Sequence, residues 1–435
     1  MQKILEKLGI TQLNPMQQAS HEAFRRGGNM VLLSPTGSGK TLAYLLPLLQ
    51  SMDPKADEVQ ALVLVPSREL AMQTQQVAAR AATGIRSLAV YGGRPAMDEH
   101  RQMNGLRPQL IIGTPGRMLD HLQKGNITAD GVRCLVIDEF DKSLELGFQQ
   151  EMQAVTEYMP VKVRKVLLSA TDSDKIPHFV GEMGGAVRLD FRGEGEARER
   201  IDRYVVHSPV KDKLETLAAL LRTRGRERSI VFLGYRESVL RVASFLARQG
   251  FAVCDFHGGM DQKTRERNLF RFASGCSNVL VSTDLASRGL DIPDVDNAIH
   301  YHLPQDEATY THRIGRTARW DATGRSFLLL GPEETFSSDV DLEEYGIPER
   351  LPAVLPPDWD TLYIGRGKKD KLSRGDVAGF MMKVAGLERD DLGTIRLHDH
   401  HAFVAVRRNR VTETLARIRN QKIKGMKTII ERIKA

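Results

Sequence analysis

The feature that most restricts the fold of this chain is a series of short, continuous apolar segments that recur between helical patterns. The first series is MVLLS (30–34), ALVLV (61–65), LIIG (110–113), CLVID (134–138) and KVLLS (165–169). Strands that are apolar at successive positions are buried on both faces, which is typical of a parallel sheet covered by helices. The segments therefore predict an α/β fold.

A second series of such segments follows a polar stretch, GEGEARER (193–200). Its members are SIVFL (229–233), AVCDF (252–256), NVLVS (278–282) and SFLLL (326–330). The polar stretch offers few apolar groups to bury, so it is interpreted as a hinge. The pattern predicts two α/β domains in tandem, 1–192 and 205–332, joined by a hinge at 193–204.

A third region follows the second series. Residues 333–358 are acidic early and Pro-rich late, and we interpret them as a semi-rigid linker. Residues 359–435 show the order strand, helix, strand, strand, helix, strand, which predicts an RRM-like α+β domain.

Charge is distributed unevenly along the chain. The net charge is +7, but residues 361–435 carry +10 and the remainder −3. A basic tail of this kind indicates either a polyanion-binding module or a solvated charged face, and charge alone does not separate the two. No apolar run reaches the roughly 18 residues of a membrane span, and the three cysteines have neither metal-ligand spacing nor the even number of a disulfide framework. A cytoplasmic protein without membrane contact is expected.

The segment SPTGSGKT lies between a strand and an apolar helical pattern, which is the context of a phosphate-binding loop. Glycines let the backbone approach phosphate oxygens, the lysine supplies positive charge, and the threonine hydroxyl can ligate Mg²⁺. The predicted nucleotide-binding residues are Ser34, Pro35, Thr36, Gly37, Ser38, Gly39, Lys40 and Thr41. Ser34 replaces the glycine that usually opens this motif.

An acidic pair follows another predicted strand, in VIDEFD (136–141). A carboxylate at a strand end can hold Mg²⁺ and a neighbouring one can activate water, although two such carboxylates can also be helix caps. The phosphate-binding loop upstream favours the catalytic interpretation for Asp138 and Glu139.

These motifs, taken in order, resemble those of the DEAD-box helicases between about Leu8 and Leu330. The series is GITQLNPMQ (9–17), SPTGSGKT (34–41), PSREL (66–70), GG (92–93), TPGR (114–117), DEFD (138–141), SAT (169–171), HGGMDQKTR (257–265), STDLASRGLD (282–291) and HRIGRTAR (312–319). The resemblance implies two tandem RecA-like domains and an ATP-dependent RNA helicase that uses ATP and Mg²⁺.

The resemblance also implies a role for each matching residue. Gln17 reads adenine, Lys40 and Thr41 bind phosphates and Mg²⁺, Asp138 binds Mg²⁺ and Glu139 is the general base. Ser169 and Thr171 couple hydrolysis to RNA, Asp291 faces the ribose, and Arg316 and Arg319 act as arginine fingers. The implied RNA contacts in the helicase domains are Arg68, Gly93, Thr114, Arg117, Gly258, Thr283 and Arg288.

Four departures from the family pattern stand out. Phe140 occupies a position that is small in the family, so its ring must be accommodated by the packing around it. Ala318 replaces a glycine, Asn14-Pro15 replaces Thr-Pro, and the aromatic residue that the family carries upstream of the glutamine is absent from this sequence.

The C-terminal region resembles the RNA-binding domain of DbpA-like helicases through GRGKKDKLSRGDVAGFMMKVAGL (365–387) and LGTIRLHDHHAFVAV (392–406). That resemblance implies recognition of a large-subunit ribosomal RNA hairpin and action on pre-ribosomal particles as a monomer. Lys368, Lys369 and Lys371 are the predicted RNA contacts here, within a basic cluster that also holds Arg366 and Arg374.

Three further features of this region leave alternatives open. Arg407, Arg408 and Arg410 form a second basic cluster that could contact phosphates. Phe403 is equally well interpreted as a base-stacking aromatic or as a core residue. Strand alternation places His398 and His401 on opposite faces, which favours solvated histidines over a metal site.

Two other functions remain as alternatives. One is a DNA helicase or translocase that shares the same core, although the TPGR, DEFD and SAT combination and the RRM-like tail favour RNA. The other is an ATP-gated RNA clamp or chaperone in which Phe140 weakens hydrolysis.

Overall fold

Two compact units make up the part of the chain that the computed structural model describes. The described residues are 2–35, 37–93, 96–171, 185–192, 201–284, 295–315, 317, 323–336 and 341–433. The described part of the first unit lies before residue 193, and that of the second lies after residue 200. Two parallel-sheet domains are followed by a C-terminal antiparallel-sheet domain, which confirms the predicted fold class.

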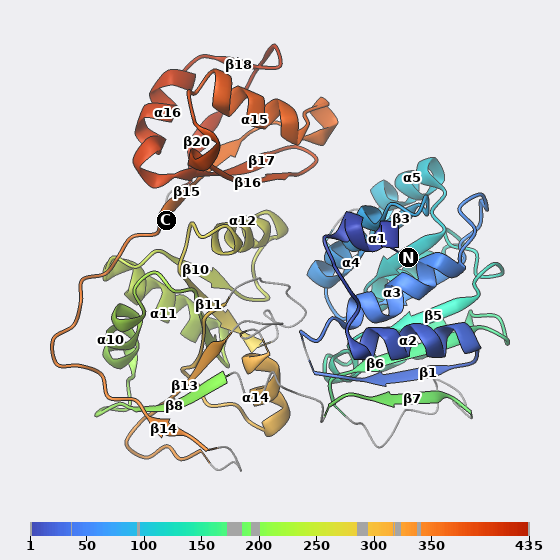
Figure 1. The fold of residues 1–435 in the computed structure, drawn as a ribbon, viewed down its shortest axis with the longest axis horizontal. Helices are drawn as coiled ribbons and strands as arrows, with labels where there is room; N and C mark the ends of the chain where they lie inside the picture. The colour runs from blue at the N-terminus through green and yellow to red at the C-terminus, as the bar shows by residue number, and fades with distance from the viewer. Residues whose placement is uncertain are drawn as a thin grey trace. The chain divides into compact units, whose positions relative to one another are not determined.

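The first unit is built on a seven-stranded parallel sheet in the order β3-β4-β2-β5-β6-β1-β7 (Figure 1). Its strands are β1 (Met30–Leu33), β2 (Ala61–Leu64), β3 (Ser87–Val90), β4 (Leu110–Gly113), β5 (Cys134–Ile137), β6 (Arg164–Ser169) and β7 (Val187–Asp190). Every residue of β1, β2, β4 and β5 is buried, which explains why their sequences are continuously apolar.

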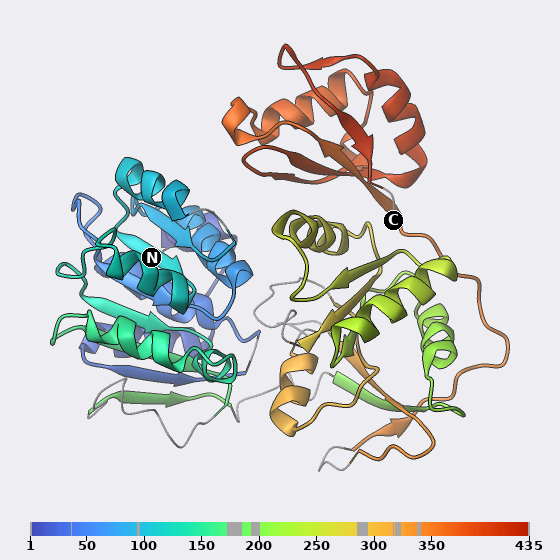
Figure 2. The ribbon, with the colours of Figure 1, turned by 180° about the vertical axis from the view of Figure 1, so that it is seen from behind.

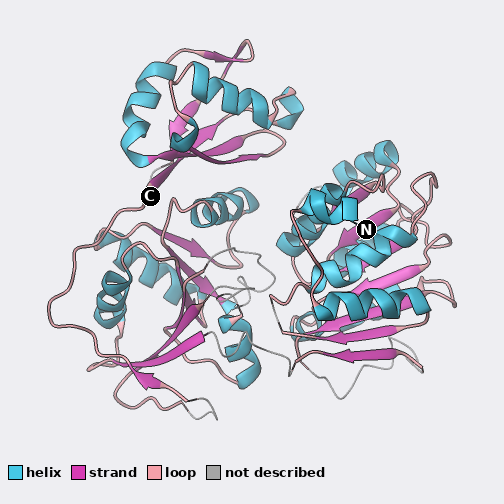
Figure 3. Ribbon diagram, in the orientation of Figure 1, coloured by secondary structure: helices cyan, strands magenta, loops and turns pink. Residues whose placement is uncertain are grey.

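Helices cover both faces of this sheet (Figure 3). They are α1 (Gln2–Leu8), α2 (Pro15–Arg26), α3 (Lys40–Ser51), α4 (Arg68–Ala81), α5 (Ala96–Leu106), α6 (Pro115–Gln123), α7 (Phe140–Glu145) and α8 (Gln149–Glu157). Successive strand residues belong to different apolar clusters, Leu62 to one and Val63 to the other. The sheet therefore separates two cores.

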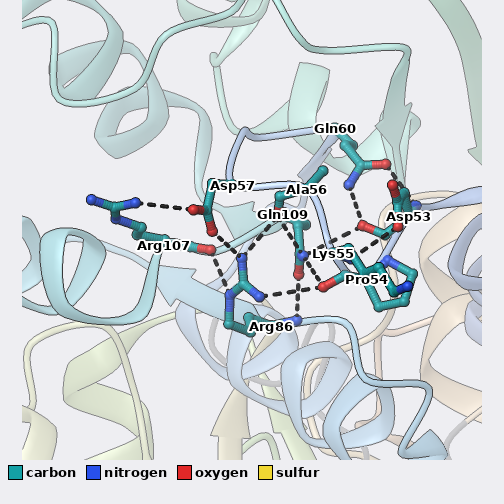
Figure 4. Close-up of polar contacts among 9 residues, drawn as sticks. All are labelled: Asp53, Pro54, Lys55, Ala56, Asp57, Gln60, Arg86, Arg107 and Gln109. Atoms are coloured by element: carbon teal, nitrogen blue, oxygen red, sulfur yellow. Dashed lines mark hydrogen bonds and ion pairs between the residues drawn. The ribbon is translucent and has the colours of Figure 1, made fainter.

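The amino ends of β2, β3 and β4 are closed by side chains that bond to loop backbone (Figure 4). Gln109 donates from Nε2 to the carbonyls of Pro54 and Ala56 at 2.8 and 2.7 Å and accepts the Arg86 N–H at 2.8 Å. Arg86 also bonds the carbonyl of Ala56 and the carboxylate of Asp57, at 2.9 and 3.1 Å. These bonds satisfy backbone carbonyl groups of the loop at the amino ends of the strands. The predicted site lies at the opposite, carboxyl ends.

The second unit begins with another seven-stranded parallel sheet, in the order β10-β11-β9-β12-β13-β8-β14. Its strands are β8 (Ile201–His207), β9 (Ser229–Leu233), β10 (Val253–Phe256), β11 (Val279–Thr283), β12 (Asn297–His300), β13 (Gly324–Leu330) and β14 (Glu343–Glu344). Its helices are α10 (Leu214–Arg224), α11 (Arg236–Arg248), α12 (Gln262–Ala273) and α14 (Glu307–Ile314).

Two predicted connecting segments contribute strands to this sheet. β8 begins at Ile201, inside the predicted hinge 193–204, and residues 193–200 lie outside the described part of the chain. β14 lies within the predicted linker 333–358 and pairs in parallel with β8. The middle of the predicted linker is therefore attached to the second sheet.

The C-terminal domain is a four-stranded antiparallel sheet in the order β16-β17-β15-β20. Its strands are β15 (Trp359–Ile364), β16 (Leu392–Leu397), β17 (Ala402–Arg407) and β20 (Ile430–Arg432), with helices α15 (Arg374–Lys383) and α16 (Val411–Ile418). A small hairpin joins β18 (Lys422–Ile423) to β19 (Met426–Lys427). The two helices pack on one face of the sheet over a core that includes Leu362, Phe380 and Val404.

The other face of this sheet packs against α12 of the second parallel-sheet domain, as both Figure 1 and Figure 2 show. Phe403 and Ala405 form one apolar cluster with Phe270 and Cys276, and Trp359 and Tyr363 pack against it. The rings of Phe270 and Phe403 lie 5.4 Å apart. The sheet face of the C-terminal domain is therefore covered by the helicase domain.

The three cysteines, Cys134, Cys254 and Cys276, are free and buried. In the described part of the chain, no helix is both long enough and apolar enough to cross a membrane.

Tyr345 is expected to hold the linker against the second sheet. Its ring packs on Tyr204 and Phe327, and its hydroxyl accepts a hydrogen bond from Arg224 at 2.5 Å. In Tyr345→Ala, loss of this packing is expected to raise the rate of tryptic cleavage after Arg350 about ten-fold or more, since about 1.4 kcal/mol of opening free energy is a factor of ten. Tyr235→Ala, at a tyrosine that is 68% exposed, is the control. Equal cleavage rates in the two variants would contradict the expectation.

Candidate nucleotide site and nucleic-acid surfaces

The phosphate-binding loop connects the carboxyl end of β1 to α3. The Ser34 N–H donates to the carbonyl of Ser169 at 3.0 Å, so the loop is tied to the end of the neighbouring strand β6. Gly37 and Gly39 have φ of +85° and +90°, which favours glycine over residues with a side chain. Lys40 begins α3 and its Nζ donates to the carbonyls of Ser34 and Pro35 at 2.5 and 3.0 Å. Thr36 lies outside the described residues.

The helix that carries Gln17 is bonded directly to this loop. Asn14 caps α2: its Oδ1 accepts the Gln17 N–H at 2.8 Å, while Gln17 Oε1 accepts the Asn14 N–H at 3.1 Å. Asn14 Nδ2 donates to the carbonyl of Ser38 at 3.0 Å, and Gln17 Nε2 donates to that of Gly39 at 3.3 Å. The Asn14 replacement therefore serves both as a helix cap and as a loop anchor.

Asp138 and Glu139 lie at the carboxyl end of β5, and both are buried. Burial, followed by the Glu139 carboxylate, raises the pKa of Asp138 to about 7, while Lys40 acts in the opposite direction. Glu139 has a φ of +49°, and its Oε1 accepts from Lys142 Nζ at 3.4 Å. Asp138 and Glu139 thus lie near Lys40 and Lys142, and they offer carboxylate oxygens of the kind that Mg²⁺ prefers.

The last acid of the DEFD motif joins it to the SAT motif. Asp141 Oδ2 accepts hydrogen bonds from the N–H of Ala170 and Thr171, each at 3.2 Å, and from the Thr171 hydroxyl at 2.9 Å. Ser169 Oγ donates to the Thr171 carbonyl at 2.7 Å. The sequence analysis assigned no role to Asp141, although its place in the motif was the available signal.

Phe140, the unusual residue of DEFD, is 2% exposed and belongs to one of the two apolar cores of the first unit. Its ring is part of that core, so the packing there accommodates its size.

The segments that carry Gly93, Thr114 and Arg117 are held together by a buried glutamate. Glu99 Oε1 accepts the Tyr91 N–H at 3.0 Å, and its Oε2 lies 2.9 Å from His121 Nε2 and 3.6 Å from Arg117 Nε. Glu99 lies on α5 and is 2% exposed. Sequence reasoning missed it because it lies outside every recognised motif.

Arg68 and Gly93 lie in close contact. A Cβ on Gly93 would lie 2.3 Å from Nη1 of Arg68, so the guanidinium occupies space that only glycine leaves open. The second unit repeats the arrangement, since a Cβ on Gly259 would lie 2.6 Å from Nη1 of Arg236. Arg236 begins α11 after β9, as Arg68 begins α4 after β2. Sequence reasoning missed Arg236, although its position relative to the strand was a usable signal.

The other predicted residues of the second unit are only partly described. Thr283 ends β11 and is buried, and Gly258 lies in the turn after β10. The next residue, Asp284, accepts two hydrogen bonds from Arg313, at 2.6 and 2.8 Å, which joins the STD and HRIGR motifs. Arg288, Asp291, Arg316 and Arg319 lie outside the described residues.

Three exposed lysines lie on one turn of the C-terminal domain: Lys368, Lys369 and Lys371. The turn is fastened to the loop between β16 and β17, because the N–H groups of Lys368 and Lys369 donate to the carbonyls of His398 and Asp399 at 2.8 and 2.9 Å. This leaves the three ammonium groups on the surface.

The second basic cluster is engaged within the chain. The Arg407 guanidinium lies 4.3 Å from the Trp359 ring centre, Arg408 Nε donates to the carbonyl of Pro357 at 2.8 Å, and Arg410 pairs with Glu413 at 2.9 Å. These contacts favour a structural role for the three arginines over phosphate binding.

The histidine loop differs from the expectation. His398 and His401 lie in the turn between β16 and β17, so strand alternation does not apply to them. Their rings are stacked, with centroids 4.5 Å apart and an angle of 11° between the ring planes. The prediction that they lie on opposite faces is therefore wrong. Phe403 packs against Phe270 and is 1% exposed, which favours the interpretation as a packing residue.

Comparison with known families accounts for most of the chain. The DEAD/DEAH box helicase model matches residues 14–178, the helicase conserved C-terminal domain matches 212–321, and the DbpA RNA binding domain matches 361–432. The loop, acid pair and tandem parallel sheets thus define an ATP-dependent helicase.

Individual relatives agree over the full length. The chain is 34% identical to the ATP-dependent RNA helicase DbpA of Escherichia coli, over 97% of this chain and 94% of that protein. It is 30% identical to DbpA of Bacillus subtilis, over 97% and 95%. The chain belongs to the DEAD-box ATP-dependent RNA helicases, in the group that carries a DbpA RNA-binding domain.

Solved structures of two helicases bound to RNA are similar to the chain. S. cerevisiae Dbp5 bound to RNA and ADP BeF3 matches at 26% identity with a TM-score of 0.69, over 77% of this chain and 88% of that one. Mss116 bound to ssRNA and UDP-BeF matches at 26% with a TM-score of 0.71, over 80% and 78%.

Glu99→Gln is expected to weaken the response to RNA. The neutral amide removes the ion pair that orients Arg117, so the RNA concentration for half-maximal ATPase stimulation should rise about ten-fold, equivalent to about 1.4 kcal/mol. The rate at saturating RNA should change little, because Asp138 and Glu139 are untouched. The control is Asp98→Asn on the same helix, whose side chain is 53% exposed. An unchanged RNA requirement in a folded Glu99→Gln protein would remove the proposed positioning role.

Proposed function

We propose that this RNA helicase locally unwinds ribosomal RNA during assembly of the large ribosomal subunit, as a cytoplasmic monomer that acts on pre-ribosomal particles. The observation that carries the proposal is the exposed lysine turn on a domain of the DbpA RNA-binding type. Helicase motifs contact the sugar–phosphate backbone and carry little sequence information, so selection of the RNA must come from another surface.

In the proposed mechanism, the loop Ser34–Thr41 holds the ATP phosphates and Lys40 exchanges its carbonyl partners for phosphate oxygens. Gln17 would read the adenine edge, and its amide, which already bonds Asn14 and Gly39, has one further donor hydrogen and one further acceptor lone pair. Because those partners belong to the helix cap and the loop, base recognition and phosphate binding would be coupled through the same hydrogen bonds.

We assign Mg²⁺ to Thr41 and Asp138. Hard oxygen ligands suit this ion, and Asp138 offers a buried carboxylate at the carboxyl end of β5, whose pKa burial and Glu139 raise to about 7. Mg²⁺ would neutralise charge on the phosphates during transfer. Glu139 would accept a proton from the attacking water, and Lys142 Nζ, 3.4 Å from its Oε1, stabilises the ionised form.

Coupling of hydrolysis to RNA is assigned to Ser169 and Thr171 through Asp141, which bonds Thr171 from the motif that carries the catalytic acids. Arg68, Gly93, Thr114 and Arg117 in the first unit, with Gly258, Thr283 and Arg288 in the second, would contact the RNA backbone. Asp291 would face the ribose, and Arg316 and Arg319 would act as arginine fingers.

A second candidate function is an RNA clamp with weak hydrolysis, which the Phe140 replacement suggested. The burial of that ring in an apolar core favours the active helicase. The two functions differ in turnover, so steady-state ATP hydrolysis with and without RNA separates them.

Glu139→Gln is expected to bind ATP with near-normal affinity but to hydrolyse it at least about 100-fold more slowly, since general-base catalysis contributes roughly 10²–10⁴-fold. Glu145→Gln, at an exposed acid that ends the same helix α7, should hydrolyse ATP normally. Nucleotide affinity by fluorescence titration and RNA-stimulated phosphate release provide the two measurements. Normal turnover in Glu139→Gln would remove the assignment of the base.

The lysine turn is expected to choose the RNA. The logarithm of the RNA-binding constant should fall linearly with the logarithm of the salt concentration. Replacing Lys368, Lys369 and Lys371 by alanine should make this slope shallower by up to about 2.7, at about 0.9 for each of three lost phosphate contacts. It should also abolish the preference for large-subunit ribosomal RNA fragments over unrelated RNA. The control replaces the same number of exposed lysines elsewhere in the domain, Lys383, Lys422 and Lys427. If unrelated RNA stimulates ATP hydrolysis by the intact protein as well as ribosomal RNA fragments do, the targeting proposal is wrong. The helicase assignment would not be affected.

A further inference from the structure

Three side chains with metal-ligating atoms meet where the C-terminal domain packs on the second helicase domain. Glu266 comes from α12, and His398 and His401 come from the turn between β16 and β17. One ligand atom from each lies within 4.8 Å of the other two. Over the described ranges, this is the group of three such residues that could hold a metal ion.

The contacts within the group leave ligand atoms available. His398 Nδ1 lies 3.0 Å from Glu266 Oε2, while Glu266 Oε1 accepts from Gln262 Nε2 at 3.2 Å, which orients the carboxylate. The Nε2 atoms of His398 and His401 are both buried and have no hydrogen-bond partner among the described residues. A buried nitrogen without a hydrogen-bond partner lowers the stability of the fold, so a ligand bound at these two imidazoles would be stabilising.

The group includes one acidic side chain that lies mostly out of solvent. The Glu266 side chain, 12% exposed, supplies negative charge at the same point.

We propose that Glu266, His398 and His401 bind one divalent transition-metal ion, of the Zn²⁺ class, which links the RNA-binding domain to the second helicase domain. Two imidazole nitrogens and one carboxylate oxygen suit Zn²⁺, whereas Mg²⁺ and Ca²⁺ prefer oxygen ligands alone. Ligand atoms around tetrahedral zinc lie about 3.4 Å apart for bonds of about 2.05 Å. Small side-chain rotations within a 4.8 Å group reach that spacing, and water completes the fourth position.

The ion would act on the RNA-binding turn as well as on the domain contact. The carbonyl of His398 accepts the Lys368 N–H, and that of the adjacent Asp399 accepts the Lys369 N–H. A metal that holds the His398–His401 turn against α12 therefore also holds the backbone that presents the two lysines. The alternative for the same residues is a metal-free ion pair between His398 and Glu266.

The test uses the full-length chain without a histidine tag, freed of nucleotide and treated with a chelator. Zn²⁺ affinity is measured by competition with a chromophoric chelator, and Co²⁺ is added separately because its tetrahedral complexes absorb visible light. We expect one Zn²⁺ per chain. Glu266→Gln and His401→Gln should each lower the affinity at least about 100-fold, since even outer-sphere partners of a metal contribute 10- to 100-fold. His400→Gln, which changes the histidine beside the site, should bind as the parent does.

A ligand exchange separates metal binding from a merely structural role. His401→Cys retains a zinc ligand, so it should still bind Co²⁺ and should add a thiolate-to-cobalt charge-transfer band that the parent lacks. Thermal unfolding verifies that each variant is folded, and Zn²⁺ should raise the unfolding temperature of the parent but not of His401→Gln. The proposal is overturned if no Zn²⁺ binds at micromolar concentration, if Glu266→Gln and His401→Gln bind as the parent does, or if the cysteine variant binds Co²⁺ without the new band. The first of these results would assign the cluster to the metal-free ion pair.

Discussion

Burial of both faces of the two parallel sheets decides where the molecule can place charge. A charged group on either face would lose its hydration without gaining a partner, which costs several kcal/mol. The polar groups of the site therefore lie at the carboxyl ends of strands, as Ser34, Asp138 and Thr283 do. Even there the surroundings are dry enough to raise the pKa of Asp138 to about 7. A site of this kind favours a ligand that brings both phosphate charge and a compensating cation.

Three buried or half-buried carboxylates then connect motifs that are distant in sequence. Glu99 joins Tyr91 to His121, Asp141 joins the acid pair to Thr171, and Asp284 joins the end of β11 to Arg313. Removing one partner of such a carboxylate leaves an uncompensated buried charge, which lowers the stability of the fold. The two segments that each carboxylate joins are therefore stable only while both contact it. Within each unit, this gives a physical route by which a change at one motif is felt at another.

Sequence reasoning recovered the parts of the structure that rest on local chemistry. The continuous apolar strands, the phosphate-binding loop and the order of the C-terminal elements could be predicted because each has a local signature. β12 was missed because Asn297 and His300 make it look polar, although inside the core each bonds a serine of a neighbouring strand, Ser229 and Ser326. The roles of Glu99 and of the histidine turn depend on contacts between distant segments, which no local pattern encodes.

The packing of the C-terminal sheet on α12 covers one face of the RNA-binding domain. The face that stacks bases in RRM domains is occupied here by Phe270, and Lys263 Nζ lies 5.1 Å from the Tyr363 ring centre. That face is therefore occupied by packing in this arrangement, while Lys368, Lys369 and Lys371 are exposed on a turn of the domain. In the proposed function, RNA would be read at such turns and edges. A flexible tether would only raise the local concentration of RNA around the helicase. A docked domain would also fix the direction from which its RNA approaches the second helicase domain, because the His398–His401 turn contacts both the lysine turn and α12. Selection of the RNA and its placement on that domain would then be one binding event.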